Sequence, residues 1–364
     1  MIVKVDTIAA LRQFVFFVKR LYRDDPHYVM PLFAILMREL RREVLQTGKY
    51  TAIMALRDGK VAGRLLYTRE HSKERGEAIF YFSFFDAIND QQVANDLFQH
   101  MESDMREAKI KYAEGTFTPY DPDTRRGVLI EGFDLDPTIF TSYNYPYYQT
   151  LLEGCGFGKS IDTYSLAVDI GPKSGKVLSS LSAFFYRRHN VSVKPIDFRH
   201  LETEMSDIHH IFQTASSDLN YQEAPSMEMI RNVAENMRLF IHPDFIQIAR
   251  NQESGEAIGF CLALPDFNQV FKKTKGRIRP LRFILEKRRI TRVRGILQYV
   301  VPEYQSTGLV GCLFAAIYDN FAKHGITEFE AGTMLETNVK PIQVFNKLGG
   351  RISKIYRIYG KEID

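Results

Sequence analysis

The order of apolar and polar positions along the chain predicts alternating strands and helices. Residues 56–67 and 250–264 each combine two apolar strands with a polar, glycine-containing turn, which is the pattern of a β-hairpin. The segment 7–22 predicts an N-terminal helix, because apolar side chains recur at the spacing of one helix face, at Ile8, Leu11, Phe14, Val15, Val18 and Leu21. Further strands are expected at 78–85, 112–117 and 294–301, and further helices at 91–109, 202–214 and 308–323.

Two landmarks of different type repeat at nearly the same distance along the chain. The hairpin glycines Gly59 and Gly255 are 196 residues apart, and the residues Asn144 and Asn338, each followed by a short amphipathic helix, are 194 residues apart. Fixed spacing of this kind is typical of an internal duplication. The sequence therefore predicts two domains of one architecture.

The predicted fold class is α+β, with each domain a mixed, mostly antiparallel twisted sheet flanked by helices. We place the N-terminal domain at 1–170, a linker at 171–190 and the C-terminal domain at 191–364. The stretch GPKSGK is the most loop-like part of the linker, and LSSLSAFFYRRHN after it is compatible with a helix.

Composition narrows the class of protein. A chain of 364 residues with 45% hydrophobic content can bury a large core, and it has no apolar run long enough to span a bilayer. Its N-terminus lacks the features of a signal peptide, which favours a cytoplasmic location. Three scattered cysteines suggest neither a disulfide framework nor a zinc site, and no metal is expected.

One stretch is strongly basic. Between Lys272 and Arg294 there are eleven Lys and Arg residues and a single acid, Glu286. A clamp for an anionic substrate or for a CoA phosphate is the preferred interpretation. A nucleic-acid or anionic-lipid surface and a plain solvated helix are the alternatives, and sparse aromatic residues make single-stranded nucleic acid the weaker one.

A strand-to-helix turn carries the candidate chemistry. In VVPEYQSTGLVGCLF, residues 300–314, a strand leads through a polar turn into a helix. The first N–H groups of such a helix and the positive end of its dipole favour an anion, and Gly308 permits close approach of a phosphate. An ordinary turn that needs glycine only for its geometry is the competing interpretation.

These residues resemble the acyl-CoA loop of the GNAT N-acetyltransferase superfamily, Gln/Arg-x-x-Gly-x-Gly/Ala. Gln305 and Gly308 match, whereas Val310 stands where the family has Gly or Ala. The stretch NVKPIQVFNKLGG resembles a later family motif through its Asn, Lys, Leu and Gly, and the whole chain resembles bacterial proteins with two tandem GNAT-like domains. The resemblance implies acetyl-CoA or another acyl-CoA as cosubstrate. It implies these binding residues: Val300, Val301, Tyr304, Gln305, Ser306, Thr307, Gly308, Leu309, Val310, Asn338 and Phe345.

Acyl transfer to an amine also needs a base and an acid. Glu336 and Glu303 are the candidate bases by position, with Glu330 the less favoured third, although each is also typical of a surface carboxylate. Many family members use a tyrosine to protonate the leaving thiolate, but this chain has Phe345 at that place, and Tyr356 is the candidate substitute.

The N-terminal half departs further from the family pattern. Its equivalent helix begins among Asp86, Asp90 and Asp96, and acids repel phosphate, so this half is not expected to bind CoA. Its long loop is expected to line a substrate cleft through Tyr120, Arg125, Tyr143 and Asn144, or to be plain surface.

The sequence thus predicts an acyl-CoA-dependent N-acyltransferase, with acetyl as the expected acyl group and an amine of a small molecule or peptide as acceptor. A non-catalytic GNAT-fold scaffold and a tRNA-dependent aminoacyltransferase of the tandem-GNAT type are the alternatives. The departures at Val310 and Phe345 favour the scaffold, whereas Gln305, Gly308 and Asn338 favour the enzyme.

Overall fold

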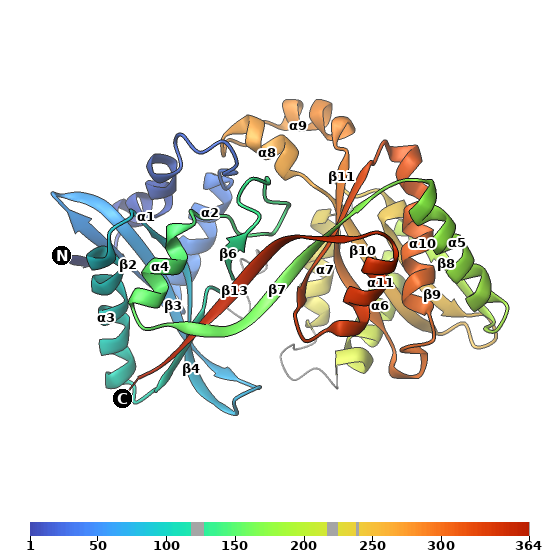
Figure 1. Ribbon diagram of the computed structural model, residues 1–364, viewed down its shortest axis with the longest axis horizontal. Helices are drawn as coiled ribbons and strands as arrows, with labels where there is room; N and C mark the ends of the chain where they lie inside the picture. The colour runs from blue at the N-terminus through green and yellow to red at the C-terminus, as the bar shows by residue number, and fades with distance from the viewer. Residues whose placement is uncertain (118–126, 217–224, 238–239, 364) are drawn as a thin grey trace.

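The fold is built on one continuous sheet of 13 strands with helices on both faces (Figure 1). A computed structural model describes residues 1–117, 127–216, 225–237 and 240–363. The strand order is β1-β2-β3-β4-β5-β13-β7-β12-β11-β10-β9-β8, and β6 also pairs with β13. The mixed α/β architecture expected from the sequence is confirmed.

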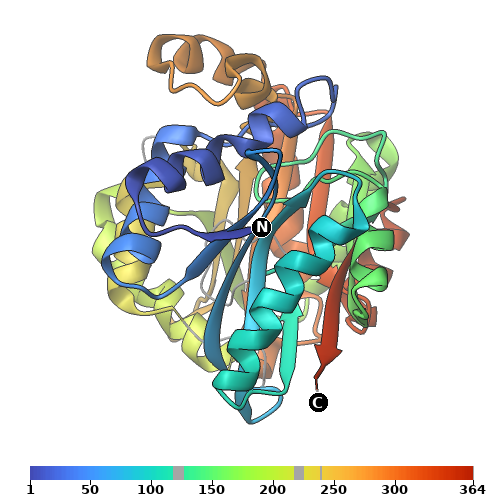
Figure 2. The same cartoon turned by 90° about the vertical axis from the view of Figure 1, so that its left-hand side faces the viewer.

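The N-terminal half opens with a helix, as the apolar spacing predicts. It contains these elements: β1 (Ile2–Lys4), α1 (Ile8–Leu21), α2 (Phe33–Leu40), η1 (Arg41–Gln46), β2 (Thr51–Arg57), β3 (Lys60–Ser72), β4 (Glu77–Ala87), α3 (Gln91–Glu107), β5 (Tyr112–Gly115), β6 (Val128–Glu131), α4 (Tyr147–Gly154) and β7 (Gly158–Asp169). Helix α3 packs on one face of the sheet and α1 on the other (Figure 2).

The C-terminal half repeats the hairpin, the parallel strand pair and the helix between the paired strands. Its elements are α5 (Pro172–Tyr186), β8 (Val191–Pro195), η2 (Phe198–His200), α6 (Leu201–Ser216), α7 (Met227–Met237), η3 (Pro243–Phe245), β9 (Ile246–Asn251), β10 (Ala257–Pro265), α8 (Asn268–Thr274), α9 (Pro280–Glu286), η4 (Lys287–Arg289), β11 (Arg292–Val300), η5 (Pro302–Tyr304), α10 (Leu309–Phe321), η6 (Ala322–His324), β12 (Glu328–Leu335), α11 (Val339–Lys347) and β13 (Arg351–Glu362). Both predicted hairpins, β2–β3 and β9–β10, are confirmed.

The two halves exchange their last strands. Strand β7 ends the N-terminal half but pairs with β12, and β13 ends the C-terminal half but pairs with β5 of the N-terminal half. Strands β7 and β13 also pair with each other over most of their length, and together they cross the middle of the molecule (Figure 1). This exchange joins the two sheets into one.

The segment after Asp169 is a helix over most of its length. Helix α5 begins with Pro172 and packs along α10. The helix expected in LSSLSAFFYRRHN is observed as far as Tyr186, whereas the expectation that GPKSGK is loop-like is wrong, because residues 172–176 form the start of the same helix. Proline at the first helical position costs no hydrogen bond. Because α5 packs along α10 and its Phe185 lies near Gly308, the residues following α5 lie close to the turn that precedes α10.

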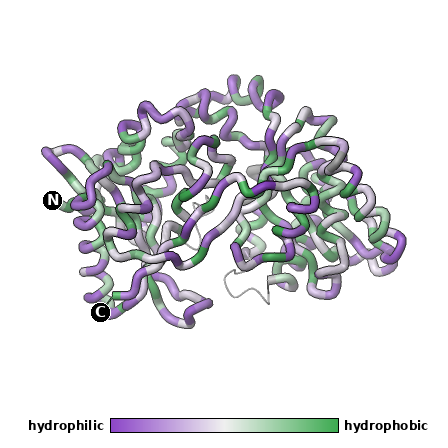
Figure 3. The backbone as a smooth tube through the Cα atoms, in the orientation of Figure 1, coloured by the Kyte–Doolittle hydropathy of each residue, from purple (hydrophilic) through white to green (hydrophobic). Residues whose placement is uncertain are grey.

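Apolar side chains form two cores, one in each half of the sheet. Hydropathy along the backbone shows the same distribution, with apolar segments inside and polar ones at the surface (Figure 3). Among the described helices, none is both long and apolar enough to cross a bilayer.

Candidate acyl-CoA site

Strands β11 and β12 begin as a parallel pair and then separate. They pair from Arg292 to Gly295 on β11, opposite Glu328 to Ala331 on β12. Among the residues that the structure describes, the rest of β11 has no strand partner on this side. The pairing of β11 with β10 shifts register at the same level, so Ile296 is an extra residue that bends the strand. The backbone N–H and C=O groups beyond Gly295 that face β12, rather than β10, are therefore free to contact a ligand.

The turn between β11 and α10 presents a helix N-terminus without a side-chain cap. Gly308 occupies the cap position with a φ of +107°, a conformation that L side chains rarely adopt, and Ser306 has a φ of +62°. Within the described residues, the N–H groups of Gly308, Leu309 and Val310 have no acceptor. Such a set of amides at the positive end of a 13-residue helix favours an anion.

Space remains open above this turn. A Cβ placed on Gly308 would meet only Phe185 at 3.8 Å, so the glycine is required by backbone conformation rather than by crowding. A substitution at this position would project a side chain into the space in front of the amides.

One cation contacts the turn, and two more follow the helix whose Phe185 lies next to it. The Lys340 ammonium, in the first turn of α11, donates to the Ser306 hydroxyl at 3.1 Å. Phe185 near the end of α5 lies close to Gly308, and the exposed residues Arg187 and Arg188 follow directly. Sequence reasoning missed these three cations. Lys340 stood within a motif whose side-chain directions were unknown, and the arginines stood in the expected linker.

The predicted cofactor-binding residues divide into two groups. Ser306, Thr307, Gly308, Val310 and Asn338 belong to the open turn or to the exposed start of α11. Gln305 and Tyr304 also lie there, but their side chains bond to the Val300 carbonyl and to the Asn251 amide respectively. The others are buried in the hydrophobic core, namely Val300, Val301, Leu309 and Phe345.

Phe345 has a packing role. Its ring lies 5.5 Å from that of Phe314 and 6.0 Å from that of Phe329, between α10 and β12. It is 4% exposed, so the position at which the GNAT motif would imply a proton-donating tyrosine is here part of the core.

The candidate bases differ in their surroundings. Glu303 is exposed on η5, next to the open turn. Glu336 follows β12, and both its carboxylate oxygens are engaged, one by the Asp162 N–H at 3.1 Å and the other by the Lys159 ammonium at 2.7 Å.

Tyr356 is fully buried in β13. Burial raises the pKa of its phenol, and the nearby Glu330 carboxylate raises it further, so the group is a neutral hydroxyl at any physiological pH. Its surroundings are the buried charged residues of β11 and β12 rather than the open turn.

A buried ionic cluster joins β12 to the exchanged strand β13 and to Thr138 of the N-terminal half. The Glu330 carboxylate on β12 accepts from Lys354 of β13 at 2.7 Å and from the Thr138 hydroxyl at 2.6 Å. Burial alone would raise the pKa of Glu330, but Lys354 and Arg294 outweigh it and hold the pKa below its usual range. Sequence reasoning missed this cluster, because charged residues in strands suggest solvent exposure.

The equivalent helix of the N-terminal half is closed to anions. The Asp90 side chain caps α3 by accepting from the N–H groups of Gln92 and Val93. Asp86, at the end of β4, is buried and pairs with Arg64 at 2.6 Å. A carboxylate of the protein itself thus occupies the place that is open in front of α10.

The residues of the N-terminal loop that were predicted to contact substrate have different surroundings. Asn144 is 5% exposed. Its side-chain amide accepts from the Leu129 N–H and donates to the Leu129 carbonyl, which fixes β6. The Tyr143 hydroxyl donates to Asp25 at 3.3 Å, and burial followed by this carboxylate raises its pKa. Tyr120 and Arg125 lie outside the described residues.

The basic segment does not border the open turn. It directly precedes the first residue of β11, whereas the turn follows the last, so the nine-residue strand separates them by about 26 Å at the usual rise per residue. The segment therefore does not contribute to an anion site at the turn itself, and its interpretation as a clamp for an anionic substrate or a CoA phosphate stays a prediction. Arg292 and Arg294 belong to the strand itself, where Arg292 pairs with the buried Asp266 at 2.7 Å.

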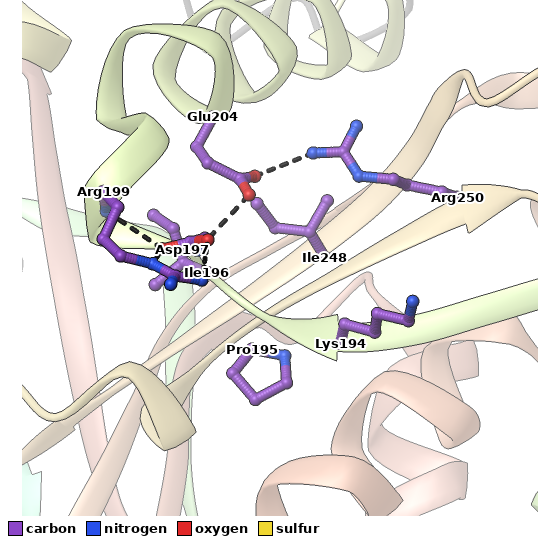
Figure 4. Close-up of a pocket in the computed structure, with 8 residues that line it drawn as sticks. All are labelled: Lys194, Pro195, Ile196, Asp197, Arg199, Glu204, Ile248 and Arg250. Carbon is purple, nitrogen blue, oxygen red and sulfur yellow. Dashed lines mark hydrogen bonds and ion pairs between the residues drawn. The ribbon is translucent and has the colours of Figure 1, made fainter.

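Two other clusters are already satisfied internally. A surface pocket of about 460 Å³ at strand β8 is lined by charged groups that pair with one another, such as Arg250 with Glu204 at 2.8 Å (Figure 4). His242, Asp244 and His324 bring three metal-ligand atoms within 4.8 Å of one another, but His324 bonds to Asp244 and His242 accepts from the Asp244 N–H.

Comparison with known proteins agrees with this architecture. No family model matches the chain. Among curated proteins, it is 26% identical to "Protein YghO" of Escherichia coli (strain K12) over 97% of this chain and 93% of that one. It is 23% identical to "Bacterial ceramide synthase" of Caulobacter vibrioides, over 100% of this chain and 97% of that one.

Among solved structures, the chain matches a tandem GNAT protein from the clavulanic acid biosynthesis pathway. The TM-score is 0.56 at 11% identity, over 100% of this chain and 98% of that one. The fold is therefore that of a tandem GNAT protein, and the resemblance seen in the motifs is confirmed at the level of fold.

Proposed function

We propose that the protein is an acyl-CoA-dependent N-acyltransferase whose C-terminal half binds the CoA pyrophosphate at the turn 304–310. One observation carries the proposal, namely the contrast between the two equivalent helices. Asp90 caps α3 with a carboxylate, whereas α10 begins at Gly308 with free amides. Lys340 next to Ser306 adds a cation where the phosphates would lie.

The separated edge of β11 supports the chemistry. A pantetheine arm lying between β11 and β12 would direct its thioester carbonyl at the free backbone groups beyond Gly295. An N–H donor at this place stabilises the oxyanion that develops as the amine attacks. The carbon–nitrogen bond forms, the carbon–sulfur bond breaks, and the products are an amide and CoA.

The proton transfers are assigned to candidate residues. The attacking amine must lose a proton, to Glu303 or Glu336 directly or through water. The thiolate must gain one, and the neutral phenol of Tyr356 is the candidate donor within the chain. Tyr356 serves only if the thioester sulfur reaches the buried cluster between β11 and β12.

The acceptor that we propose is the amine of a long-chain amino alcohol. A ceramide is an amide of such a base, and the full-length likeness to a protein named "Bacterial ceramide synthase" supports this class. Acetyl-CoA and long-chain acyl-CoA are both donors to be tested with it. A scaffold without catalysis is the alternative, and it predicts no amide product with any donor.

The first test is a calorimetric titration with CoA. Gly308→Glu places a carboxylate in front of the free amides, and we expect it to weaken CoA binding at least about a hundredfold, by repulsion and loss of the anion site. Gly325→Glu is the matched control, because Gly325 also has a positive φ, at +68°, has open space around it and ends the same helical segment.

The outcomes separate the proposals. Loss of binding in Gly308→Glu with retention in Gly325→Glu, and similar melting temperatures for both, supports the site. Equal affinity of all three proteins for CoA contradicts it. CoA binding without any amide formed from a long-chain amino alcohol rejects the acceptor while leaving the site in place.

A further inference from the structure

Helix α9 holds most of its apolar side chains in solvent, while its Phe283 packs on the protein body. None of the residues in Pro280–Glu286 is buried. Leu281 is 80% exposed and Leu285 is 72% exposed, and Ile278 and Ile284 are each 54% exposed. Figures 1 and 2 show α8 and α9 together at one edge of the molecule, beyond the end of the sheet. Aliphatic groups exposed this far and this close together indicate a surface that meets an apolar partner.

The same segment is strongly cationic. Residues 272–289 contain nine Lys and Arg residues and the single acid Glu286, a net charge of +8 in a chain whose total is +4. The rest of the chain therefore sums to −4. Lys272 and Lys273 pair with Asp136 and Glu286, but within the described residues no carboxylate lies within ion-pair distance of Lys275, Arg277, Arg279, Arg282, Lys287 or Arg288.

The segment is also fixed to the body rather than loose. The Lys272 ammonium bonds to both oxygens of Asp136, in the N-terminal half, at 2.5 and 2.6 Å. The Gly276 carbonyl accepts from the Phe33 N–H, and the Phe283 ring packs on that of Phe267 at 5.3 Å. A rigid base holds the exposed side chains in place, so little order is lost when they bind.

We propose that 272–289 is a membrane-docking element, which places Leu281, Leu285, Ile278 and Ile284 among the lipid headgroups of an anionic bilayer. The unpaired cations around them meet the lipid phosphates. Exposed aliphatic side chains ringed by Lys and Arg are the features of an interfacial helix. Nucleic acid is disfavoured, because recognition of unpaired bases uses aromatic stacking and the most exposed apolar side chains here are aliphatic.

This inference does not rest on the proposed acyl transfer. The segment lies at the opposite end of β11 from the open turn, so a loss of CoA binding and a loss of membrane binding can be told apart.

The test is sedimentation of the full chain with vesicles in moderate salt. We expect binding to phosphatidylcholine vesicles that contain phosphatidylglycerol, and at least about tenfold weaker binding to pure phosphatidylcholine. Leu281→Glu/Leu285→Glu should bind the anionic vesicles at least about tenfold more weakly than the unmodified chain. Met229→Glu is the matched control, since Met229 is a 49% exposed apolar residue of α7, and it should bind normally.

Charge removal gives a second, independent measurement. Arg279→Gln/Arg282→Gln should also weaken vesicle binding, and its salt dependence should be shallower. Both side chains are exposed, so folding is expected to persist, and a thermal melt checks this.

Three results would overturn the proposal. In the first, the unmodified chain fails to sediment with anionic vesicles. In the second, the double leucine variant sediments as well as the unmodified chain, which would mean that the chain adsorbs by charge alone. In the third, single-stranded RNA binds more tightly than anionic vesicles, and the leucine variant retains RNA while the arginine variant loses it.

Discussion

Removing Lys354 should destabilise the protein strongly, because it would leave the Glu330 carboxylate buried without its main partner. The side chains of Lys354 and Glu330 are 1% and 4% exposed, and they join β13 to β12. Breaking a buried ion pair by deleting one partner costs about 3–5 kcal/mol. Arg294 and the Thr138 hydroxyl remain near the carboxylate, so we expect Lys354→Met to lose about 3 kcal/mol of unfolding free energy.

The loss should also depend on pH, with a sign fixed by Glu330. In the unmodified chain the pKa of Glu330 is lowered, so the pair contributes stability above the unfolded value of about 4.3 and loses it as pH falls through the folded pKa. Without Lys354, burial dominates and raises that pKa above about 4.3. The destabilisation should then be largest near neutral pH and smaller at about pH 5, because protonation of the carboxyl group in the folded variant increases as pH falls.

Urea denaturation at both pH values measures this effect. Arg351→Met is the matched control, because Arg351 lies on the same strand but pairs with Asp169 where both side chains are more than half exposed, so its loss should cost under about 1 kcal/mol. Adding Glu330→Gln to Lys354→Met should restore part of the stability and abolish the pH dependence. The reasoning is refuted if Lys354→Met costs no more than Arg351→Met, or if its cost is the same at both pH values.

Three further predictions concern the site and the thiols. Lys340→Glu should weaken CoA binding about tenfold in calorimetry, whereas Lys347→Glu at the far end of α11 should not; equal losses would mean a general charge effect. Glu336→Gln should lower the turnover of amide formation while CoA affinity persists, and full turnover would exclude Glu336 as the base. Burial raises the pKa of the thiols of Cys155, Cys261 and Cys312 to about 12. Iodoacetamide should therefore not alkylate the native chain near pH 8, and rapid labelling would contradict the burial of these thiols.

Local features of the fold could be predicted from the sequence. The hairpins follow from alternation and from turn glycines such as Gly59 and Gly255, whose φ values are positive. The turn before α10 follows in the same way, since a strand, a polar turn and an apolar helical pattern are all encoded within fifteen residues. These features depend on neighbours in the chain, which the sequence displays directly.

Features that depend on distant pairing could not be predicted. The exchange of β7 and β13 is set by which strand edges are free, and no local pattern states this. The Lys354–Glu330 pair follows from that exchange, because it buries two charged residues that alternation alone would place in water. Lys340 lay within a recognised motif, yet only the folded chain brings it to Ser306.

The direction of β11 is the feature that relates the two proposed surfaces. The docking element 272–289 precedes the first residue of this strand, and the open turn at Gly308 follows its last residue. If the docking element rests on a bilayer, the turn faces away from it, toward the aqueous phase from which acyl-CoA would bind. An acceptor amine held in the membrane would then have to approach from the opposite end of β11, where the docking element lies. Vesicle binding that left CoA affinity unchanged would fit this arrangement, and CoA binding abolished by vesicles would argue that the two surfaces face the same way.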